Sequence, residues 1–564
     1  PERIAHLWGV THEPAVGGQA SLEERLALGF YAPLYLGRAF HGHAASAPVE
    51  LSLITNGLQD VTGSEALEPE KALVLGPCKV LPQELGPGWR CRSIDVALPE
   101  AGGPGGARLV EHLLAELAAP ASEPVVAWRG GKRWVETFVP SRLPEPAPGA
   151  VSLREGGVYL ITGGLGGLGL EVARWMVEQG ARHVVLVGRR APSAQASEAV
   201  RALEQAGAHV TVTSVDVANE AEVARMLQGI DANSPPLRGI VHSAGVLDDG
   251  ALPQQDLERF ERVMTPKVAG AWNLHRLTAG RPLDFFVLYS SMSGLLGLPG
   301  QGNYAAANAA MDALAHYRRQ QGLPALSVNW GPFSEVGLAA AHSNRGERLA
   351  GQGMASFTPR QGEMLLERLL QEGAVHVGAV ALDVRQWLEF FPSAASLRVW
   401  DELAAERHGD QRGRSGFLLE LRRANVNERA GKMEAYLRER LAQVLRIDPS
   451  RVGRHEPFRG LGLDSLMSLE LRNRIEAALD LKLSVTLLWA HSTLAALAVY
   501  LLDQLGLAPK QNEAPAPAAQ TEQSIVMNRP PAPAEPEAHQ LAELSEGKLL
   551  EMVDDALAGW EDSK

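Results

Sequence analysis

Short apolar runs alternate with helix-length stretches between Val158 and Gly331, and this alternation constrains the fold more than any other feature of the chain. The runs are VYLIT, HVVLVG, HVTVTSVDV, GIVHSAGV and FFVLYSS. Strands that alternate with helices predict βαβ units and a parallel sheet. Near-continuous apolar strands suit a sheet that is buried on both faces. We therefore expect an α/β fold with a doubly wound parallel sheet in this part of the chain.

Residues 1–139 show a fainter version of the same pattern. LSLITNG and KALVLG are predicted to be strands, and VVAWRGGKRWVETFV is predicted to be a hairpin that turns at Gly130 and Gly131. No glycine fingerprint follows any of these strands. This part is therefore expected to have a structural task.

Length and composition exclude several classes of protein. The chain has 564 residues, which predicts several domains. Its net charge of −13 argues against nucleic-acid binding as the main function. Its two cysteines, Cys78 and Cys91, cannot form a disulfide framework or a four-cysteine zinc site. We expect no metal site and a reducing, cytoplasmic setting.

The sequence also argues against a membrane protein and against a complete polypeptide. The most apolar long stretch, Val485–Leu502, is interrupted by polar residues and is too polar to span a membrane. No signal peptide opens the chain, and its first residue is Pro1 rather than Met. We therefore expect a piece of a longer polypeptide with no membrane partner.

Composition divides the rest of the chain into segments. The proline-rich residues 140–149 are predicted to be a linker, and the charged stretch 408–428 is a softer boundary. Residues 429–505 are predicted to form a small helical bundle. One face of its first helix carries Met433, Leu437, Leu441 and Val444. Residues 506–537 are rich in Ala, Pro, Glu and Gln and are predicted to be a disordered linker.

The acidic tail, residues 538–564, is predicted to contain a last helix at 546–560 with Ser545 as its N-cap. Four apolar residues form a stripe along that helix: Leu550, Val553, Leu557 and Trp560. Such a helix can be an ordinary surface helix. Because it follows a disordered linker and has no core of its own, we expect it to need a partner.

A glycine-rich loop lies between the strand VYLIT and the helix LEVARWMVEQG. The loop consists of Thr162, Gly163, Gly164, Leu165, Gly166, Gly167, Leu168 and Gly169. Glycines allow a tight turn and let the backbone approach a pyrophosphate, which the N–H groups and dipole of the helix N-terminus then bind. A plain turn is the alternative. The flanking strand and helix favour a Rossmann-like dinucleotide site.

The end of the next strand indicates which dinucleotide binds. An NAD site would usually place an acidic residue there. This chain has Arg189 and Arg190, which suit a 2′-phosphate through bidentate pairing. The alternative is a solvated basic strand end. We predict NADPH.

The segment from Ser290 to Asn308 carries groups that suit the reduction of a ketone, which needs a hydride and a proton. A tyrosine can supply the proton if a nearby cation lowers its pKa, and a hydroxyl can hold the carbonyl oxygen where charge develops. Tyr304 and Asn308 lie four residues apart, on one face of a helix, and Ser291 closes the preceding strand.

These residues resemble the short-chain dehydrogenase/reductase superfamily, with its TGxxxGxG loop and a serine thirteen residues before the tyrosine. Most members have Lys four residues after the tyrosine, where this chain has Asn308. That exchange resembles the ketoreductase domains of modular polyketide synthases, and Lys267 matches their upstream lysine. The resemblance implies that Tyr304 is the proton donor and that Ser291 binds the substrate oxygen. It implies further that Lys267 lowers the tyrosine pKa and contacts the ribose, and that Asn308 fixes Lys267 and a relay water. A core tyrosine and a surface lysine are the alternatives.

The resemblance extends to other segments. HSAGVLDD matches that family's cofactor floor, which implies roles for Ser243, Ala244 and Gly245, and Asp216 and Val217 match its adenine-contacting pair. Residues 1–139 resemble the catalytically silent structural half of such ketoreductases, a degenerate Rossmann-like domain whose first strands are missing here.

Leu247, Asp248 and Asp249 resemble the LDD motif of B-type ketoreductases. A-type enzymes carry a Trp eight residues before the tyrosine, where this chain has Leu296. Both features imply a D-configured, (R), hydroxyl. The alternative is a loop with two solvated acids, and the configuration of the α-carbon stays open.

The segment GLDSL resembles the attachment motif of acyl carrier proteins, which implies that Ser465 is phosphopantetheinylated. A serine at the start of a helix suits this, because its phosphodiester would sit at the positive helix end. An N-capping Asp464–Ser465 pair is the alternative. Residues 538–564 resemble docking segments that pass a carrier to the next synthase polypeptide.

Together these resemblances imply a ketoreductase, a four-helix acyl carrier protein and a docking tail of a type I modular polyketide synthase. The expected domains are 1–139, 150–400 and 429–505, then the linker 506–537 and the tail 538–564. The expected reaction is NADPH-dependent reduction of a carrier-bound β-ketoacyl thioester. Its product passes to a downstream synthase polypeptide, in a synthase expected to be a homodimer. The alternatives are a free-standing fatty-acid-type reductase and a carrier scaffold with an inactive reductase.

Overall fold

The structure is a computed structural model, and it describes most of the first 507 residues. The described residues are 3–12, 26–40, 48–86, 88–99, 105–121, 123–141, 143, 153–337, 345–395, 397–405, 416–445, 447–463, 465–479, 481, 483–484 and 487–507. The predicted docking helix and nearly all of the predicted linker 506–537 lie outside them. Within the described residues, no helix has the length and apolar character needed to cross a membrane.

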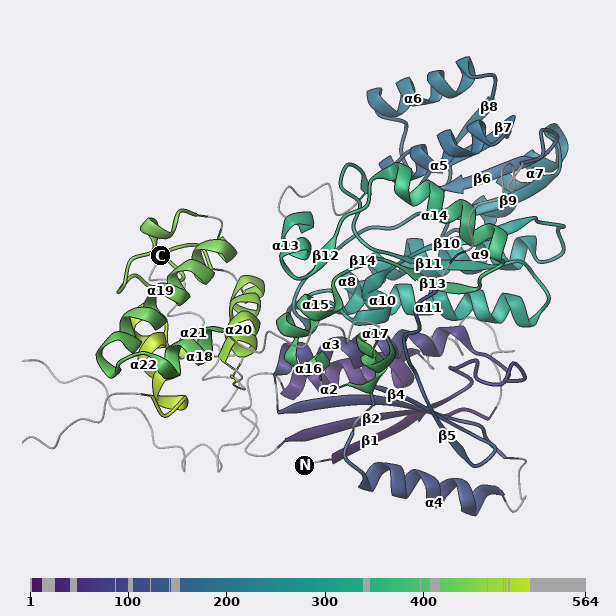
Figure 1. The fold of residues 1–564 in the computed structure, drawn as a ribbon. Coiled ribbons are helices and arrows are strands. Elements are labelled where there is room, and N and C mark those ends of the chain that lie inside the picture. Colours follow the sequence, from purple (N-terminus) through teal and green to yellow (C-terminus); the bar gives the residue numbers. More distant parts are fainter. Residues whose placement is uncertain are drawn as a thin grey trace, which may run out of the picture. The chain divides into compact units, whose positions relative to one another are not determined.

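The N-terminal region, residues 3–143, is built on a five-stranded sheet in the order β1-β2-β3-β4-β5 (Figure 1). Its strands are β1 (Arg3–Gly9), β2 (Val49–Asn56), β3 (Trp89–Val96), β4 (Val125–Arg129) and β5 (Lys132–Val135). The first four run parallel, and β4 and β5 form the predicted antiparallel hairpin. Gly130 and Gly131 have φ values of 55° and 75°, which glycine adopts readily, so the predicted turn is confirmed.

Helices cover both faces of this first sheet. The helix α4 (Gly105–Ala118) packs Leu109, Leu113 and Leu117 against Ile54 and Ile94 on one face. The opposite face carries η1 (Ala27–Tyr31), α2 (Ala32–Phe40) and α3 (Leu75–Leu85). Figure 1 shows α2 and α3 on the other side of the sheet from α4. The region is therefore a parallel α/β layer structure, as the sequence predicts.

The prediction of a strand at KALVLG is wrong. These residues form the end of the 3₁₀ helix η2 (Pro69–Val74) and the start of α3. A short apolar run fits a buried helix as well as a buried strand. Pro69, in the first turn of η2, favours a helix start. The buried Lys71 ammonium lies 2.7 Å from a carboxylate oxygen of Glu68, and this ion pair offsets the cost of burying both charges.

The central region, residues 153–405, contains a seven-stranded, wholly parallel sheet. Its spatial order is β13-β11-β10-β9-β6-β7-β8. The strands are β6 (Val158–Thr162), β7 (His183–Gly188), β8 (His209–Ser214), β9 (Leu237–His242), β10 (Phe285–Ser291), β11 (Leu326–Trp330) and β13 (His376–Ala379). The chain order reverses between β6 and β9, so this is the predicted doubly wound sheet with a switch point at its centre.

Alternation along the strands buries both faces of this sheet. Tyr159 and Ile161 point into one apolar core, whereas Val158 and Leu160 point into the other. The first core is covered by α5 (Gly167–Glu178), α6 (Ala194–Gln205) and α14 (Pro359–Glu372). The second is covered by α7 (Glu220–Asn233), α9 (Gly270–Thr278) and α11 (Gly302–Gln320).

The chain after β11 adds a smaller cluster around Trp387, Phe390, Phe391 and Trp400. Its elements are α13 (Arg345–Gly351), β12 (Met354–Ala355), β14 (Ala381–Leu382), α15 (Val384–Phe390), α16 (Pro392–Ala395), η5 (Arg398–Trp400) and α17 (Asp401–Ala405). Met292 also belongs to this cluster, which therefore supports the segment after β10.

The N-terminal and central regions share one apolar core. Alanines on α11, including Ala305 and Ala306, pack against η2 and α3. A Cβ atom on Gly76 would lie 2.2 Å from the backbone nitrogen of Ala306. Small side chains on both helices therefore allow a close backbone approach that a larger residue would prevent.

The C-terminal helical region, residues 416–507, has a core of its own. It contains α18 (Gly416–Arg423), α19 (Val426–Leu445), η6 (Pro449–Arg451), α20 (Ser465–Leu479), α21 (Leu487–Ala490) and α22 (Leu494–Gln504). Met433, Leu437, Leu441 and Val444 are all buried in this core, as the helical pattern predicts. The core also includes Leu421, so part of the charged stretch 408–428 is helical and packs with the bundle.

Candidate active site

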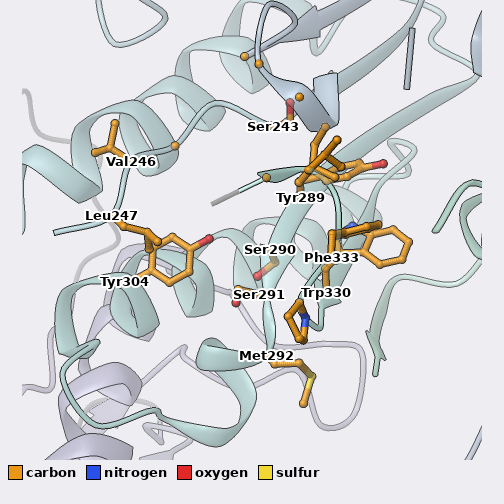
Figure 2. A pocket seen from close by; sticks show the side chains of 18 of the residues that line it. Ser243, Val246, Leu247, Tyr289, Ser290, Ser291, Met292, Tyr304, Trp330 and Phe333 are labelled. Carbon is orange, nitrogen blue, oxygen red and sulfur yellow. The ribbon is translucent and has the colours of Figure 1, made fainter. Parts of the chain in front are cut away.

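A cavity of about 830 Å³ opens at the carboxyl ends of the central strands (Figure 2). Its lining includes Gly163 after β6, Gly188 at the end of β7 and Ser291 at the end of β10. The switch point of a doubly wound sheet places a ligand crevice at this edge. Its volume lies within the range of sites for small molecules and cofactors.

The glycine-rich loop forms one wall of this cavity. Gly163 has a φ of 67°, and a Cβ atom there would lie 2.9 Å from the nitrogen of Ala244. A Cβ atom on Gly169 would lie 2.4 Å from the carbonyl oxygen of Gly163. Both positions therefore need glycine. The helix α5 starts at Gly167, so its free N–H groups lie at this wall.

Most of the predicted cofactor residues line the cavity. These are Gly163, Leu165, Gly166, Gly167, Leu168, Gly169, Arg189, Arg190, Ser243 and Gly245. The others are not among its lining residues: Thr162, Gly164, Asp216, Val217 and Ala244.

Thr162 supports the site from behind. Its hydroxyl oxygen lies 2.7 Å from Nδ1 of buried His242, whose Nε2 lies 2.9 Å from the Lys267 carbonyl oxygen. A carbonyl only accepts, so Nε2 donates and Nδ1 accepts from Thr162. Ser243 Oγ donates to the Thr162 carbonyl oxygen at 2.7 Å. The end of β6 and the backbone at Lys267 are thereby tied together.

The four predicted catalytic residues come from three elements and converge. Tyr304 and Asn308 lie one turn apart on α11, and Ser291 ends β10. Lys267 lies in a wide π-helical turn, η4 (Thr265–Ala269), between α8 (Leu257–Met264) and α9. Such turns occur often at functional sites. In Figure 2 the Tyr304 hydroxyl points toward Ser290 and Ser291.

Lys267 and Asn308 form a buried pair beside the tyrosine. Lys267 Nζ donates to Asn308 Oδ1 and to the Tyr289 carbonyl oxygen, each at 3.0 Å. It lies 5.1 Å from the centre of the Tyr304 ring. Asn308 Nδ2 donates to the Tyr304 carbonyl oxygen at 2.7 Å and to Ser293 Oγ at 3.2 Å. Tyr304, Ser291 and Lys267 line the cavity, and Asn308 lies behind them.

Known proteins match both the central and the C-terminal regions. The KR domain model matches residues 157–335, and the phosphopantetheine attachment site model matches residues 435–501. An A-type ketoreductase structure from a modular polyketide synthase is 32% identical with a TM-score of 0.60, covering 67% of this chain and 78% of that one. This chain belongs to the polyketide synthase ketoreductases.

Other polyketide synthase proteins also match this chain. The first ketoreductase of the tylosin synthase is 30% identical with a TM-score of 0.60, over 72% of this chain and 83% of that one. Two polypeptides of the phenolphthiocerol/phthiocerol polyketide synthase of Mycobacterium tuberculosis also match. One is 39% identical over 64% of this chain, and the other is 33% identical over 81% of it. The matches span only 16% and 25% of these two mycobacterial proteins, respectively.

A ketoreductase takes NADPH as its hydride donor, and the phosphopantetheine attachment site carries 4′-phosphopantetheine. The cavity of this ketoreductase fits NADPH in three respects. Glycines without room for a Cβ form one wall, the N-terminus of α5 faces the lining, and two arginines stand at the end of β7.

Burial shifts the pKa values of two of the predicted catalytic residues, Tyr304 and Lys267. It raises the pKa of Tyr304 to about 12, although hydrogen bonds with Asn308 and Ser291 oppose this. The family resemblance implies that Lys267 lowers the pKa of Tyr304. The structure differs, because burial has a larger effect on this pKa than the hydrogen bonds do. Burial also lowers the pKa of Lys267 to about 7, against the attraction of Asp312. Tyr304 therefore keeps its proton at neutral pH, which its predicted role as proton donor requires.

A buried polar network beneath Ser291 was not predicted from the sequence. Asn329 Nδ2 donates to Ser290 Oγ at 3.0 Å, to the Ser291 carbonyl oxygen at 2.9 Å and to Asp312 Oδ2 at 2.8 Å. His376 Nε2 lies 2.6 Å from Asn329 Oδ1. Burial acts to lower the pKa of His376, but the Asp312 carboxylate outweighs it and raises the pKa. The network holds the end of β10 in place.

One member of this network, Asp312, could have been predicted from the sequence. Asp312 follows Asn308 by four residues, as Asn308 follows Tyr304, so all three share one face of α11. A polar residue recurring at this spacing among alanines indicates a buried polar stripe. His376 carries no such signal, because it arrives from a distant strand.

The residues predicted to control stereochemistry divide into two groups. Leu247 and Asp249 line the cavity, and Gln301 Nε2 donates to Asp249 Oδ2 at 3.1 Å. Asp248 does not line it and forms ion pairs with Arg259 and Arg262. Neither acid is therefore a simple solvated loop residue. Leu296 ends the short helix α10 (Met292–Leu296).

The attachment motif of the carrier lies at a helix start. Ser465 is the first residue of α20, and the residue before it, Asp464, lies outside the described residues. Gly462 has a φ of 89°, which turns the chain just before the helix. Phe458, in the loop before this helix, is buried in the core of the helical region.

Proposed function

We propose that this ketoreductase reduces a carrier-bound β-ketoacyl thioester to a D-configured, (R), β-hydroxyacyl thioester. The observation that carries the proposal is the convergence of Tyr304, Ser291 and Lys267 on one wall of the cofactor-sized cavity. NADPH supplies the hydride. The remaining work is to bind the ketone, stabilise its oxygen and deliver a proton.

Each residue of the catalytic group has one task in this proposal. The Ser291 hydroxyl donates a hydrogen bond to the carbonyl oxygen, where negative charge develops. The Tyr304 O–H bond breaks as its proton moves to that oxygen, leaving a tyrosinate. Lys267, 5.1 Å from the ring centre, stabilises that negative charge in its protonated form, which its lowered pKa confines to pH values up to about 7. Asn308 holds the ammonium in place through the 3.0 Å hydrogen bond.

Arg189 and Arg190 are proposed to select NADPH over NADH. They follow β7, which pairs with β6 beside the glycine loop, and both line the cavity. Guanidinium groups bind a phosphate through several charge-assisted hydrogen bonds. No acidic residue takes the corresponding position at this strand end.

The D configuration is proposed from the entrance of the cavity. Asp249 and Leu247 line it, and Leu296 stands where A-type enzymes carry a tryptophan. Hydride leaves one face of a fixed nicotinamide, so the side from which the ketone enters decides which face of the ketone is reduced. The similarity to an A-type structure concerns the fold and is compatible with this assignment.

The reduction is tested by incubating the full chain with NADPH and a β-ketoacyl thioester of N-acetylcysteamine. NADPH oxidation is followed by absorbance, and the product is separated by chiral chromatography. A mainly D-hydroxy product supports the proposal. A mainly L-hydroxy product contradicts the stereochemical assignment, and an absence of oxidation favours the carrier scaffold with an inactive reductase.

The carrier is proposed to hold the acyl chain on phosphopantetheinylated Ser465. Ser465→Ala should abolish the mass shift produced by a phosphopantetheinyl transferase and leave reduction of the diffusible thioester unchanged. Ser492→Ala, which removes an exposed hydroxyl of the same bundle, is the control and should be loaded normally. A mass shift that persists in Ser465→Ala contradicts the attachment site.

We also propose that residues 1–139 are a structural domain, 150–400 the catalytic domain and 429–505 the carrier. The linker 506–537 and the docking tail 538–564 would pass the product to a downstream synthase polypeptide, in a homodimeric synthase. Deleting residues 538–564 should weaken that transfer while leaving reduction and loading intact. Equal transfer rates with and without the tail would exclude docking.

A further inference from the structure

A carboxylate from the N-terminal region bridges two segments beside the active site. Glu84, on the last turn of α3, accepts a hydrogen bond from the Gly300 nitrogen at 2.7 Å on Oε1. Its Oε2 accepts another from the Leu252 nitrogen at 2.6 Å. Glu84 is only 7% exposed. Burying a carboxylate is costly unless hydrogen bonds compensate, and here both of its oxygens bind main-chain donors.

The two segments that Glu84 joins are the entrance loops, defined here as residues 246–252 and 297–301. Residues of both line the cavity, namely Val246, Leu247, Asp249, Leu298, Pro299 and Gln301. The loops also bind each other directly, because the Gly250 nitrogen donates to the Gly300 carbonyl oxygen at 2.8 Å. The second loop leads straight into α11, which carries Tyr304.

Two more side chains of α3 bind the same part of the central region. Lys79 Nζ donates to the Gly294 carbonyl oxygen at 3.1 Å. Gln83 Nε2 donates to the Gly297 carbonyl oxygen. A Cβ atom on Gly297 would lie 2.5 Å from Cβ of Lys79. The helix is therefore fitted closely to the chain that precedes the catalytic tyrosine.

Other buried acids of the N-terminal region behave differently. Glu116 is as deeply buried as Glu84, but its carboxylate pairs with Arg92 and Arg133 inside the same region. Burial raises the pKa of Glu84 to about 7, although its two main-chain hydrogen bonds oppose this. Among the described residues, both hydrogen bonds of the Glu84 carboxylate cross to the entrance loops, and no cation of its own region pairs with it.

We propose that Glu84 is a positioning residue for the substrate entrance. Its carboxylate fixes the separation of the two entrance loops and so the path along which a ketone reaches Tyr304. The N-terminal region then contributes to substrate fit and stereochemical outcome, and not only to stability. This inference rests on the proposed reduction for its catalytic readout.

The test compares Glu84→Gln with Glu116→Gln in the full chain. Glutamine keeps the shape of Glu84 but replaces one acceptor by an NH₂ group, so one loop loses its partner. Above pH 7, where the Glu84 carboxylate is charged, we expect KM for the N-acetylcysteamine β-ketoacyl thioester to rise about tenfold, the value for one hydrogen bond to a charged group. The ratio of D to L product should fall, while Kd for NADPH stays unchanged. Glu116→Gln should lower the melting temperature without changing KM or the product ratio.

Hydrogen exchange measures the same contact without any catalysis. Glu84→Gln should speed exchange of the amides of Leu252 and Gly300, and Glu116→Gln should not. Unchanged exchange at both amides overturns the proposal, whether or not the unmodified chain reduces the thioester. If the chain is active, a Glu84→Gln variant that loses stability but keeps KM and product ratio also overturns it.

A second variant covers the case in which Glu84→Gln does not fold. Gln83→Met keeps the length of the side chain on α3 and removes its hydrogen bond to Gly297. We expect a smaller rise in KM and a smaller loss of stereochemical purity in the same direction. Wild-type values for both would count against a role for α3 at the entrance.

Discussion

The N-terminal and central regions both present the carboxyl ends of parallel strands, yet only one of these edges is open. In the N-terminal region, Asp95 at the end of β3 accepts hydrogen bonds from Thr55 Oγ1 and from the Leu58 and Gln59 nitrogens. Arg129, at the end of β4, forms ion pairs with Asp95 and Glu65. The polar groups of this edge therefore satisfy one another.

The same edge of the central sheet ends in small residues and hydroxyls that face a cavity. Gly163, Gly188, Ser243 and Ser291 all line it. Both sheets are thus built mainly of parallel strands, and they differ in which residues occupy the edge where those strands end. Activity depends on the residues placed at that edge rather than on the layer architecture. Four predictions test this difference, in order of decreasing effect.

The largest effect is expected from Tyr304→Phe in the central region. It removes the acid hydroxyl and keeps the ring, so reduction should fall by roughly 10²- to 10⁴-fold, the usual contribution of general acid catalysis. NADPH binding should be largely kept. The matched control is Tyr31→Phe, a half-buried tyrosine of the N-terminal region whose pKa is also raised to about 12 by burial. Near-wild-type NADPH oxidation by Tyr304→Phe would contradict the catalytic assignment.

The second prediction compares how much the arginines at the strand ends of the two regions contribute to the free energy of folding. Arg129→Ala leaves the fully buried Asp95 carboxylate without its cation. Removing one partner of a buried ion pair costs about 3–5 kcal/mol of folding free energy. Urea unfolding should show this loss, whereas the Arg189→Ala/Arg190→Ala double variant should unfold like the wild type. Equal stability of both variants would mean that the closed edge is not maintained by this ion pair.

The third prediction concerns the contribution of Arg189 and Arg190 to the choice between NADPH and NADH. Arg189→Ala/Arg190→Ala should raise KM for NADPH by roughly 10- to 100-fold, as expected for lost charge-assisted hydrogen bonds. KM for NADH should change little, because NADH has no 2′-phosphate. Steady-state kinetics with both cofactors give the ratio. An unchanged ratio would argue against phosphate recognition at the end of β7.

The smallest expected effect is on the pH dependence of folding stability, which Glu84 and Lys267 should change in opposite directions. Burial raises the pKa of Glu84 from 4.5 to about 7 and lowers that of Lys267 from 10.5 to about 7. Between pH 4.5 and about 7 the unfolded chain has lost the Glu84 proton that the folded chain keeps, so Glu84 makes stability fall as pH rises. Between about 7 and 10.5 the unfolded chain keeps the Lys267 proton that the folded chain has lost, so Lys267 makes stability rise.

Single variants separate the contributions of Glu84 and Lys267 to this pH dependence. Subtracting the unfolding free energy of Glu84→Gln from that of the wild type should give a difference that declines with pH over the lower interval. The corresponding difference for Lys267→Met should increase with pH over the upper interval. A flat difference in either interval would show that the group titrates alike in the folded and unfolded chains.

The sequence predicts features that depend on neighbouring residues better than features that depend on distant ones. The β6–loop–α5 unit and the spacing of Tyr304 and Asn308 are local, so they can be read directly and the structure contains them. KALVLG is also local, but six apolar residues do not distinguish a buried helix from a strand. The π-helical turn that holds Lys267 leaves no periodic signal of its own.

Long-range contacts account for most of what was not predicted. Glu84 binds Leu252 and Gly300, which lie 168 and 216 residues away. His376 reaches Asn329 only because β13 pairs with β11. A single sequence shows no pattern that links such partners, because their proximity arises from sheet order and from the packing of two separate regions.

The close approach of Gly76 to Ala306 has a consequence for building chimeric synthases. Residues 140–157 look like a convenient place to join parts from different enzymes, since they lie between the two sheets in the sequence. A donor with alanine in place of Gly76 would collide with the backbone at Ala306, and one with different residues at the end of α3 would meet the wrong loops. The two sheets should therefore be exchanged together as one cassette, with crossover points placed before the first and after the second.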